Sequence, residues 1–380
     1  MVDARQRERK RIRLPKVRYF DYGFLGMVFM LLGFGLVMLY SSSAYTAALH
    51  YGSPTYFLKK QAMMAMAGLF AMFVMARFPY RSWLKLDKMA YVGTLILCVL
   101  VLFIGYSAKG QARWIPIGGI RFQPSELAKP AITVAIASWI YKKRDKLLYV
   151  EHLVFGLGIT VIMAFPILLN NLSTAAIVVG IGFGMMLVAT RRKLELFGLS
   201  GVLIFLAAIG TKLKGGYRSS RIANWRHPEL ASDDQGYQIL QGLYAIGSGG
   251  PFGKGLGSSA QKLGKIPEVQ NDMIFTVIVE ELGVFGAVCV VIMFMVLLWR
   301  MMFIANHAKD MFGSFLVIGI MIHVSLQIIL NIAVASNAIP NTGVTLPFIS
   351  YGGTSLIILL AEMGIVLSVS RDIPLDQTEL

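Results

Sequence analysis

The 380-residue chain is 56% hydrophobic and only 15% charged, and its mean hydropathy is +0.65. Soluble domains carry about 25% charged residues, so this composition excludes a water-soluble globule. Both cysteines, Cys98 and Cys289, lie in apolar runs, which excludes a disulfide framework, and five scattered histidines argue against a Cys/His zinc site. The formal charge of +16 does not by itself indicate nucleic acid, because the charges of a membrane protein must first be sorted by side.

Ten apolar stretches are long enough to cross a hydrocarbon core of about 30 Å. They predict an all-α integral membrane protein, a ten-helix bundle, and their continuity excludes an outer-membrane barrel. The predicted spans are residues 20–42, 60–77, 88–106, 125–142, 152–170, 172–190, 195–212, 272–300, 312–336 and 352–370.

Basic clusters between the spans predict the orientation. All of them fall on one side of the ten-span arrangement, so both termini are expected in the cytoplasm. We therefore divide the chain into a basic cytoplasmic tail (1–19), a membrane domain (20–370) and a second cytoplasmic tail (371–380), with the first span retained as an anchor rather than cleaved as a signal peptide. The clusters are Arg5 to Arg18, Arg77 to Lys88, Lys142 to Lys146, Arg191 to Lys193, Arg300 with Lys309, and Arg371.

The outer side then receives segments rich in Gly, Pro and polar residues: 107–124, 337–351, and the large loop 213–271 between spans seven and eight. Within that loop, the glycine-rich stretch GSGGPFGKGLG at 247–257 is not a phosphate-binding Walker loop, because Lys254 is followed by Gly255 where Ser or Thr is required. We expect it to be a flexible or tightly turned loop.

Ionisable groups inside spans are costly and need partners. Glu126 and Lys129 lie three residues apart on one helical face, where each can neutralise the other. The pair is either structural or part of a polar cavity near Arg113 and Arg121. A second set is expected to form interhelical hydrogen bonds, with His323 in a packing role: Glu280, Glu281, His323, Gln327, Asn331 and Glu362.

Asp272 is the candidate catalytic residue, placed where the eighth span begins at the outer interface. A carboxylate at a helix N-terminus is favourable by about 0.3–1 kcal/mol without any catalysis, so position alone leaves its role open. The outer segments also carry many basic residues, which suits a lipid-linked phosphate substrate. These are Lys109, Arg113, Arg121, Arg218, Arg221, Arg226, Lys254, Lys262 and Lys265.

Four long motifs occur in one order: ARWIPIGGIRFQPSELAK at 112–129, GYQILQGLYAIGSGGPFGKGLGSSAQK at 236–262, PEVQNDMIFTVIVEELG at 267–283 and TGVTLPFISYGGTS at 342–355. With these motifs the chain resembles the shape, elongation, division and sporulation (SEDS) glycosyltransferases, typified by FtsW and RodA. The tract GFGLVMLYSSSAYTA at 33–47 and Thr345 resemble the division branch, FtsW, more than the elongation branch. Asn171 stands where many relatives carry an acid.

The resemblance implies a peptidoglycan glycosyltransferase that polymerises lipid II at the outer face of the cytoplasmic membrane, for septal wall synthesis. It implies inverting displacement of undecaprenyl diphosphate with Asp272 as general base. No cofactor is required, although Mg²⁺ or Mn²⁺ could assist at the diphosphate. The expected partners are a class B penicillin-binding protein and other division or elongation proteins, and no nucleic acid. A lipid II flippase and a non-catalytic scaffold stay open as alternatives. The expected substrate-binding residues are Arg113, Glu126, Lys129, Arg218, Arg221, Lys254, Lys262, Ser350 and Gly352.

Overall fold

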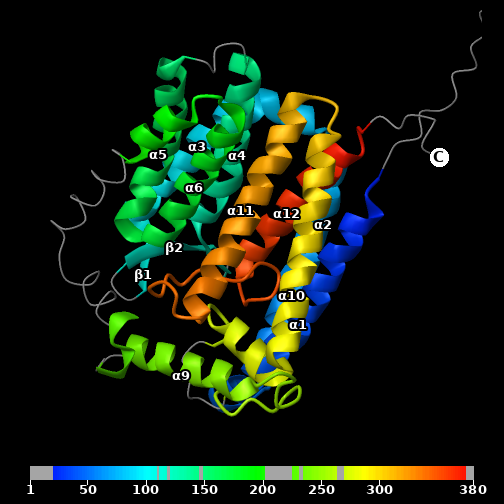
Figure 1. Ribbon diagram of the computed structural model, residues 1–380, viewed down its shortest axis with the longest axis vertical. Helices are drawn as coiled ribbons and strands as arrows, with labels where there is room; N and C mark the ends of the chain where they lie inside the picture. The colour runs from blue at the N-terminus through cyan, green and yellow to red at the C-terminus, as the bar shows by residue number, and fades with distance from the viewer. Residues whose placement is uncertain are drawn as a thin grey trace, which may run out of the picture.

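A bundle of long helices makes up most of the molecule (Figure 1). The computed structural model describes residues 20–108, 111–117, 120–144, 149–201, 225–230, 234–262 and 269–373. The helices are α1 (Tyr22–Tyr51), α2 (Tyr56–Arg77), α3 (Trp83–Ile104), α4 (Pro124–Lys143), α5 (Val150–Asn170), α6 (Leu172–Ala189), α9 (Asp234–Gly249), α10 (Ile274–Asn306), α11 (Met311–Ala335) and α12 (Gly353–Ser370), with short 3-10 turns at Tyr80–Ser82 and Pro228–Leu230.

Eight helical segments of the described chain are long and apolar enough to cross a membrane: α1, α2, α3 with its preceding 3-10 turn, α5, α6, α10, α11 and α12. The predicted class, a helical multi-pass membrane protein, is therefore confirmed. Helix α4 coincides with the fourth predicted span, but its charged residues make it too polar to be counted with the eight. Of the seventh predicted span, 195–212, only the helical start up to residue 201 lies within the described residues.

Small residues let the central helices approach closely. A Cβ on Gly364 of α12 would lie 2.3 Å from the Met72 carbonyl oxygen of α2, and one on Gly35 of α1 would lie 2.4 Å from the Phe348 carbonyl oxygen. Lipid provides no hydrophobic force between helices, so close backbone contact of this kind is a main source of their association. The loop before α12 is thereby packed directly on α1.

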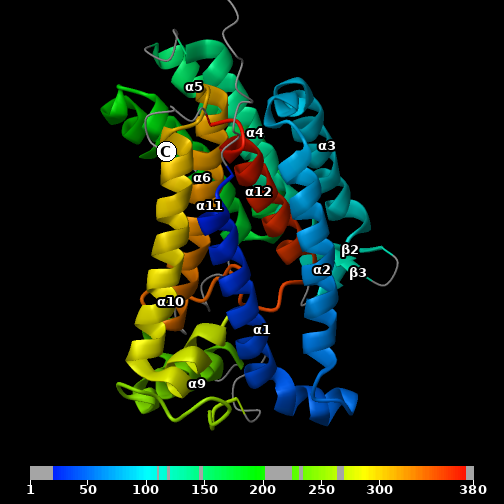
Figure 2. The ribbon, with the colours of Figure 1, turned by 90° about the vertical axis from the view of Figure 1, so that its right-hand side faces the viewer.

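The two ends of the bundle differ in character. The beginning of α1 and the end of α12 lie at one end, whereas α9 lies across the opposite end (Figures 1 and 2). At the first end, Asp21 Oδ1 accepts a hydrogen bond from the backbone amide of Phe24 at 2.7 Å. The same oxygen forms an ion pair with Arg300 Nη2 at 2.6 Å. This contact ties the start of α1 to the far part of α10.

A small antiparallel sheet, which the sequence did not predict, occupies much of the 107–124 segment. Its strands are β1 (Tyr106–Ala108), β2 (Gln111–Ile117) and β3 (Ile120–Phe122), in the order β1-β2-β3. Trp114 pairs with Tyr106, and Ile115 pairs with Phe122. The two outer strands have only three residues each, too few to show an alternating pattern, and the central strand β2 packs against α3, α4 and α5.

Helix α10 differs from the continuous eighth span expected at 272–300. Gly283 has φ 70° and ψ −171°, so the helix breaks there into residues 274–282 and 284–306. The glycine-rich loop fills this break. The amides of Lys254 and Gly255 donate to the carbonyls of Glu280 and Glu281 at 2.9 Å, and the amides of residues 284 and 285 donate to those of residues 250 and 251 at 3.0 Å. The loop is therefore tightly turned, and it completes the broken helix.

Glycine is required at this junction for steric reasons. A Cβ on Gly253 would lie 2.2 Å from the Glu281 carbonyl oxygen, and one on Gly283 would lie 2.4 Å from the Gly253 nitrogen and from the Pro251 carbonyl oxygen. Both glycines also have positive φ, which other residues adopt at a cost.

We expect Gly283→Ala to lower the free energy of unfolding by more than the roughly 1–2 kcal/mol of left-handed strain, because the methyl group also overlaps backbone atoms. Thermal unfolding of the purified protein in detergent measures the effect. Gly26→Ala in α1 is the matched control, since a Cβ there meets nothing within 4 Å. Equal unfolding temperatures for the two variants would contradict the packed junction.

Candidate functional site

Asp272 lies where α9, α10 and α11 meet. It precedes Met273, the residue that caps α10, and its side chain is partly exposed. Its backbone carbonyl accepts a hydrogen bond from the side-chain amide of Asn331 in α11 at 2.8 Å. Its Oδ1 accepts one from the side-chain amide of Gln238 in α9 at 3.3 Å. Helices α9 and α11 thus hold the residue from two sides, α9 through its carboxylate and α11 through its backbone.

The loop between α11 and α12 forms the next part of the site. Asn331 also donates to the Val344 carbonyl at 2.8 Å, and Asn341 donates to Gln238 at 3.4 Å. Gly343 has φ 67°, and a Cβ there would lie 3.9 Å from Asp272 Oδ2. Asn331, expected to join two helices, instead holds two stretches of irregular backbone together.

The same loop continues into a small pocket that Ser350 and Gly352 line together with Gln327, Thr345 and Ser355. The Ser350 hydroxyl accepts a hydrogen bond from the Leu346 amide at 2.9 Å. Gln61 of α2 donates to the Ser350 carbonyl at 3.1 Å and accepts from the Gly352 amide at 3.4 Å. The two residues expected to bind substrate therefore sit in a loop that α2 holds in place.

Glu126 and Lys129 form the predicted pair. Lys129 Nζ lies 2.7 Å from Glu126 Oε2, and the two residues are 1% and 8% exposed. The Ser355 hydroxyl of α12 also contacts the Glu126 carboxylate. Ser355 also lines the pocket described above, so the ion pair lies next to the loop between α11 and α12. Gly343 of the same loop lies beside Asp272.

Arg113 lies on β2, where its Nε donates to the Asn170 carbonyl at the end of α5 at 2.8 Å. It lines a second small pocket with Cys98, Ser125 and Asn171. Asn171 caps α6 by accepting a hydrogen bond from the Thr174 amide at 3.1 Å, a role that Asn fulfils as well as Asp. Arg218 and Arg221 lie outside the described residues.

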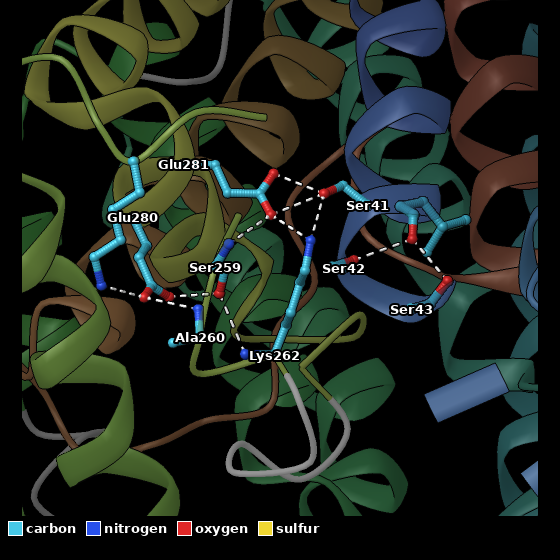
Figure 3. Close-up of polar contacts among 10 residues, drawn as sticks. Ser41, Ser42, Ser43, Ser259, Ala260, Lys262, Glu280 and Glu281 are labelled. Atoms are coloured by element: carbon cyan, nitrogen blue, oxygen red, sulfur yellow. Dashed lines mark hydrogen bonds and ion pairs between the residues drawn. The ribbon is translucent and has the colours of Figure 1, made fainter. Parts of the chain in front are cut away.

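Lys262 faces the buried carboxylate of Glu281 (Figure 3), and Lys254 is paired with the buried carboxylate of Glu280. Lys254 Nζ lies 2.7 Å from Glu280 Oε1, and Lys262 Nζ lies 2.6 Å from Glu281 Oε1. Elsewhere in the bundle, His323 Nδ1 of α11 lies 2.8 Å from Glu362 Oε2 of α12. The hydrogen bonds between helices expected for Glu281, His323 and Glu362 are confirmed, since Glu281 also accepts from Ser41 of α1.

A family described as cell cycle protein, which groups FtsW, RodA and SpoVE, matches residues 23–373. The chain belongs to this family. Stage V sporulation protein E of Bacillus subtilis is 39% identical over 352 residues, which cover 90% of this chain and 94% of the relative. A probable peptidoglycan glycosyltransferase FtsW of Trichlorobacter lovleyi is 36% identical and covers 97% of this chain and 96% of the relative. The predicted membership of the SEDS family, with FtsW-like relatives, is confirmed.

Solved structures agree with this assignment. A peptidoglycan synthase complex, described as coordinating polymerization and crosslinking, contains a chain that is 26% identical with a TM-score of 0.79, covering 94% of this chain and 99% of that one. The rod shape determining protein RodA of Thermus thermophilus is 26% identical with a TM-score of 0.69, covering 95% of this chain and 100% of that one. Both likenesses extend over nearly the whole membrane domain.

We expect Glu126→Gln or Lys129→Met alone to destabilise the protein by about 3–5 kcal/mol, because each leaves a buried unpaired charge, and the double variant to cost less than the sum. Unfolding measurements in detergent give the coupling free energy. Arg192 and Glu195 supply a matched control, since they form a pair with the same spacing whose side chains are 44% and 45% exposed. That pair should couple by at most about 1 kcal/mol. Additive effects of the two changes at Glu126 and Lys129 would argue against a coupled buried pair.

Proposed function

We propose that the chain is a peptidoglycan glycosyltransferase that polymerises lipid II, with Asp272 as its general base. The enzyme class comes from relatives that are named peptidoglycan glycosyltransferases and are aligned with nearly the whole chain. The observation that carries the assignment of Asp272 is its setting. Its partly exposed carboxylate accepts a hydrogen bond from Gln238, its backbone carbonyl is held by Asn331, and it lies beside a loop that leads to a small pocket.

The chemistry needs only one such carboxylate. The donor sugar is α-linked to diphosphate and the polymer is β-linked, so a single in-line displacement with inversion is sufficient. Asp272 accepts the proton of the acceptor 4-hydroxyl as the new glycosidic bond forms, and undecaprenyl diphosphate leaves with the electron pair of the old bond. The hydrogen bond from Gln238 to Oδ1 fixes the orientation of the carboxylate.

Cations are needed to stabilise the charge of the diphosphate as it leaves. Arg113 supplies one of them in the proposal, and Arg218 and Arg221 belong to it from the sequence alone. Lys129 is 1% exposed and already paired with Glu126, so its task is to hold that pair rather than to bind the diphosphate. Among the residues that the structure describes, no group of three or more His, Cys, Asp or Glu side chains could hold a metal ion.

We assign the protein to septal wall synthesis with a class B penicillin-binding protein as partner and lipid II as substrate. The resemblance of its N-terminal tract to the division branch supports the septal role. The likeness to a chain of a complex that coordinates polymerization and crosslinking supports a partner of this kind. A lipid II flippase or a passive scaffold does not itself polymerise glycan, so neither would need Asp272 as a general base.

The proposed orientation has both termini in the cytoplasm and Asp272 outside. The basic clusters at residues 77–88, 142–146 and 191–193 support this arrangement. The ends of the chain support it too, because α1 begins and α12 ends on the side of the bundle away from α9 (Figure 2).

In intact cells, a cysteine introduced at the exposed Ser258 should react with a membrane-impermeant thiol reagent, whereas one at Lys143 should react only after the membrane is permeabilised. The buried Cys98 and the partly buried Cys289 should give little background. Labelling at Lys143 in unbroken cells would reverse the proposed orientation.

Asp272→Asn keeps the size of the side chain but removes the basic charge, so we expect glycan polymerisation to fall by about 10²-fold or more while lipid II binding and thermal stability are retained. Polymerisation of labelled lipid II by the purified protein measures the rate. Glu151→Gln, the same change at an exposed carboxylate at the start of α5, is the control and should leave the rate unchanged. Near-normal polymerisation by a folded Asp272→Asn protein would contradict the catalytic role of Asp272 and leave a flippase or a scaffold as the alternatives.

A further inference from the structure

Two adjacent carboxylates, Glu280 and Glu281, are completely buried directly before the break in α10. Each has its own lysine from the loop that follows α9. Glu280 Oε1 lies 2.7 Å from Lys254 Nζ, and Glu280 also accepts hydrogen bonds from the Ser259 hydroxyl at 2.5 Å and the Ala260 amide at 3.1 Å. Two buried charges side by side are stable only when each is neutralised and hydrogen-bonded.

The second pair reaches a third element (Figure 3). Lys262 is 6% exposed, and its Nζ lies 2.6 Å from Glu281 Oε1 and 3.0 Å from the Ser41 hydroxyl of α1. Ser41 donates to the Glu281 carboxylate at 2.6–2.8 Å. The triad of Ser41, Lys262 and Glu281 therefore joins α1, the loop after α9 and α10 at one buried point.

This triad lies at the far end of the helical segment that Asp272 precedes. Residues 274–282 form that segment, which the break at Gly283 separates from the rest of α10. Its beginning is held by Asn331 through the Asp272 carbonyl. Its end is held by the backbone hydrogen bonds from residues 254 and 255 and by the triad. A short helical segment transmits a shift of its end to its beginning, because its hydrogen-bonded backbone is stiff.

We propose that Lys262 is a positioning residue for glycosyl transfer: by neutralising Glu281 and binding Ser41, it fixes the 274–282 segment and so the Asp272 carboxylate. This inference rests on the proposed function of Asp272. It gives Lys262 a different task from diphosphate binding. An ammonium group that is buried and already bound to one carboxylate and one hydroxyl has little capacity left for a substrate, and moving it would leave Glu281 charged and unpaired.

The test uses the full-length protein in lipid nanodiscs with labelled lipid II, and rates are normalised to the folded fraction. Lys262→Met should lower kcat by tenfold or more and change the KM for lipid II by less than threefold. Lys262→Met combined with Glu281→Gln should recover most of kcat, because the unpaired charge is gone. Lys142→Met is the control and should leave both constants unchanged. It also removes a lysine from an ion pair, with 2.6 Å between Lys142 Nζ and Asp87 Oδ2, but the Lys142 side chain is 47% exposed.

Several results would overturn the proposal. If Lys262 binds diphosphate, Lys262→Met raises KM and the double variant is no better than the single one. If the triad only stabilises the fold, kcat per folded molecule stays normal. Should Lys262→Met fail to fold, Ser41→Ala removes one arm of the triad without exposing a charge, and it should still lower kcat at constant KM; an unchanged kcat would overturn the proposal. Asp272→Asn in the same assay tests the proposed function separately. Loss of the general base should lower the rate whether or not Lys262 positions it, so a normal rate for Asp272→Asn would contradict the proposed function and not the role of Lys262 alone.

Discussion

The structure around the candidate site depends on one constraint: inside lipid, every backbone amide and carbonyl must find its partner within the protein. Helix α10 breaks at Gly283, which frees carbonyls at residues 280 and 281 and amides at 284 and 285. An unsatisfied group of this kind costs several kcal/mol. Residues 250–255 supply the missing partners, so the loop after α9 and the segment leading from Asp272 form a single unit. The break is possible only because glycines allow two backbones to meet without intervening side chains.

The same constraint explains the side chains near Asp272. The loop between α11 and α12 has irregular backbone, and polar residues of neighbouring helices satisfy it: Asn331 binds the Val344 carbonyl, Ser173 binds the Thr342 carbonyl, and Gln61 binds the Ser350 carbonyl. These contacts come from α11, α6 and α2. The site is therefore made of helix ends and loops, but rigid helices hold each of them. Such an arrangement suits a base that must be aligned with a bound hydroxyl to within a fraction of an ångström.

Charge at the site is more balanced than the composition suggests. The net charge of +16 and the many basic residues of the outer segments indicate a strongly cationic surface. In the folded chain, Lys254 and Lys262 are neutralised by Glu280 and Glu281, and Lys129 is neutralised by Glu126. Burial explains the pairing, because an isolated charge within the bundle would be very costly. For Lys129 and Lys262 the ammonium group is itself buried, whereas for Lys254 only the partner carboxylate of Glu280 is. Charges that look alike in the sequence therefore divide into those that hold the fold together and those that stay available to a substrate.

Local properties of the sequence determined much of this protein. Runs of apolar residues predicted the spans, the i,i+3 spacing predicted the contact of Glu126 with Lys129, and long motifs identified the family, because each of these depends on neighbours along the chain. The tertiary structure alone decided the break at Gly283, the small sheet at β1–β3 and the partners of Lys262. Ser41 and Glu281 are 240 residues apart, and no spacing rule connects them. Hydropathy registers how apolar a segment is, but which buried donor meets which acceptor is settled only when distant helices pack.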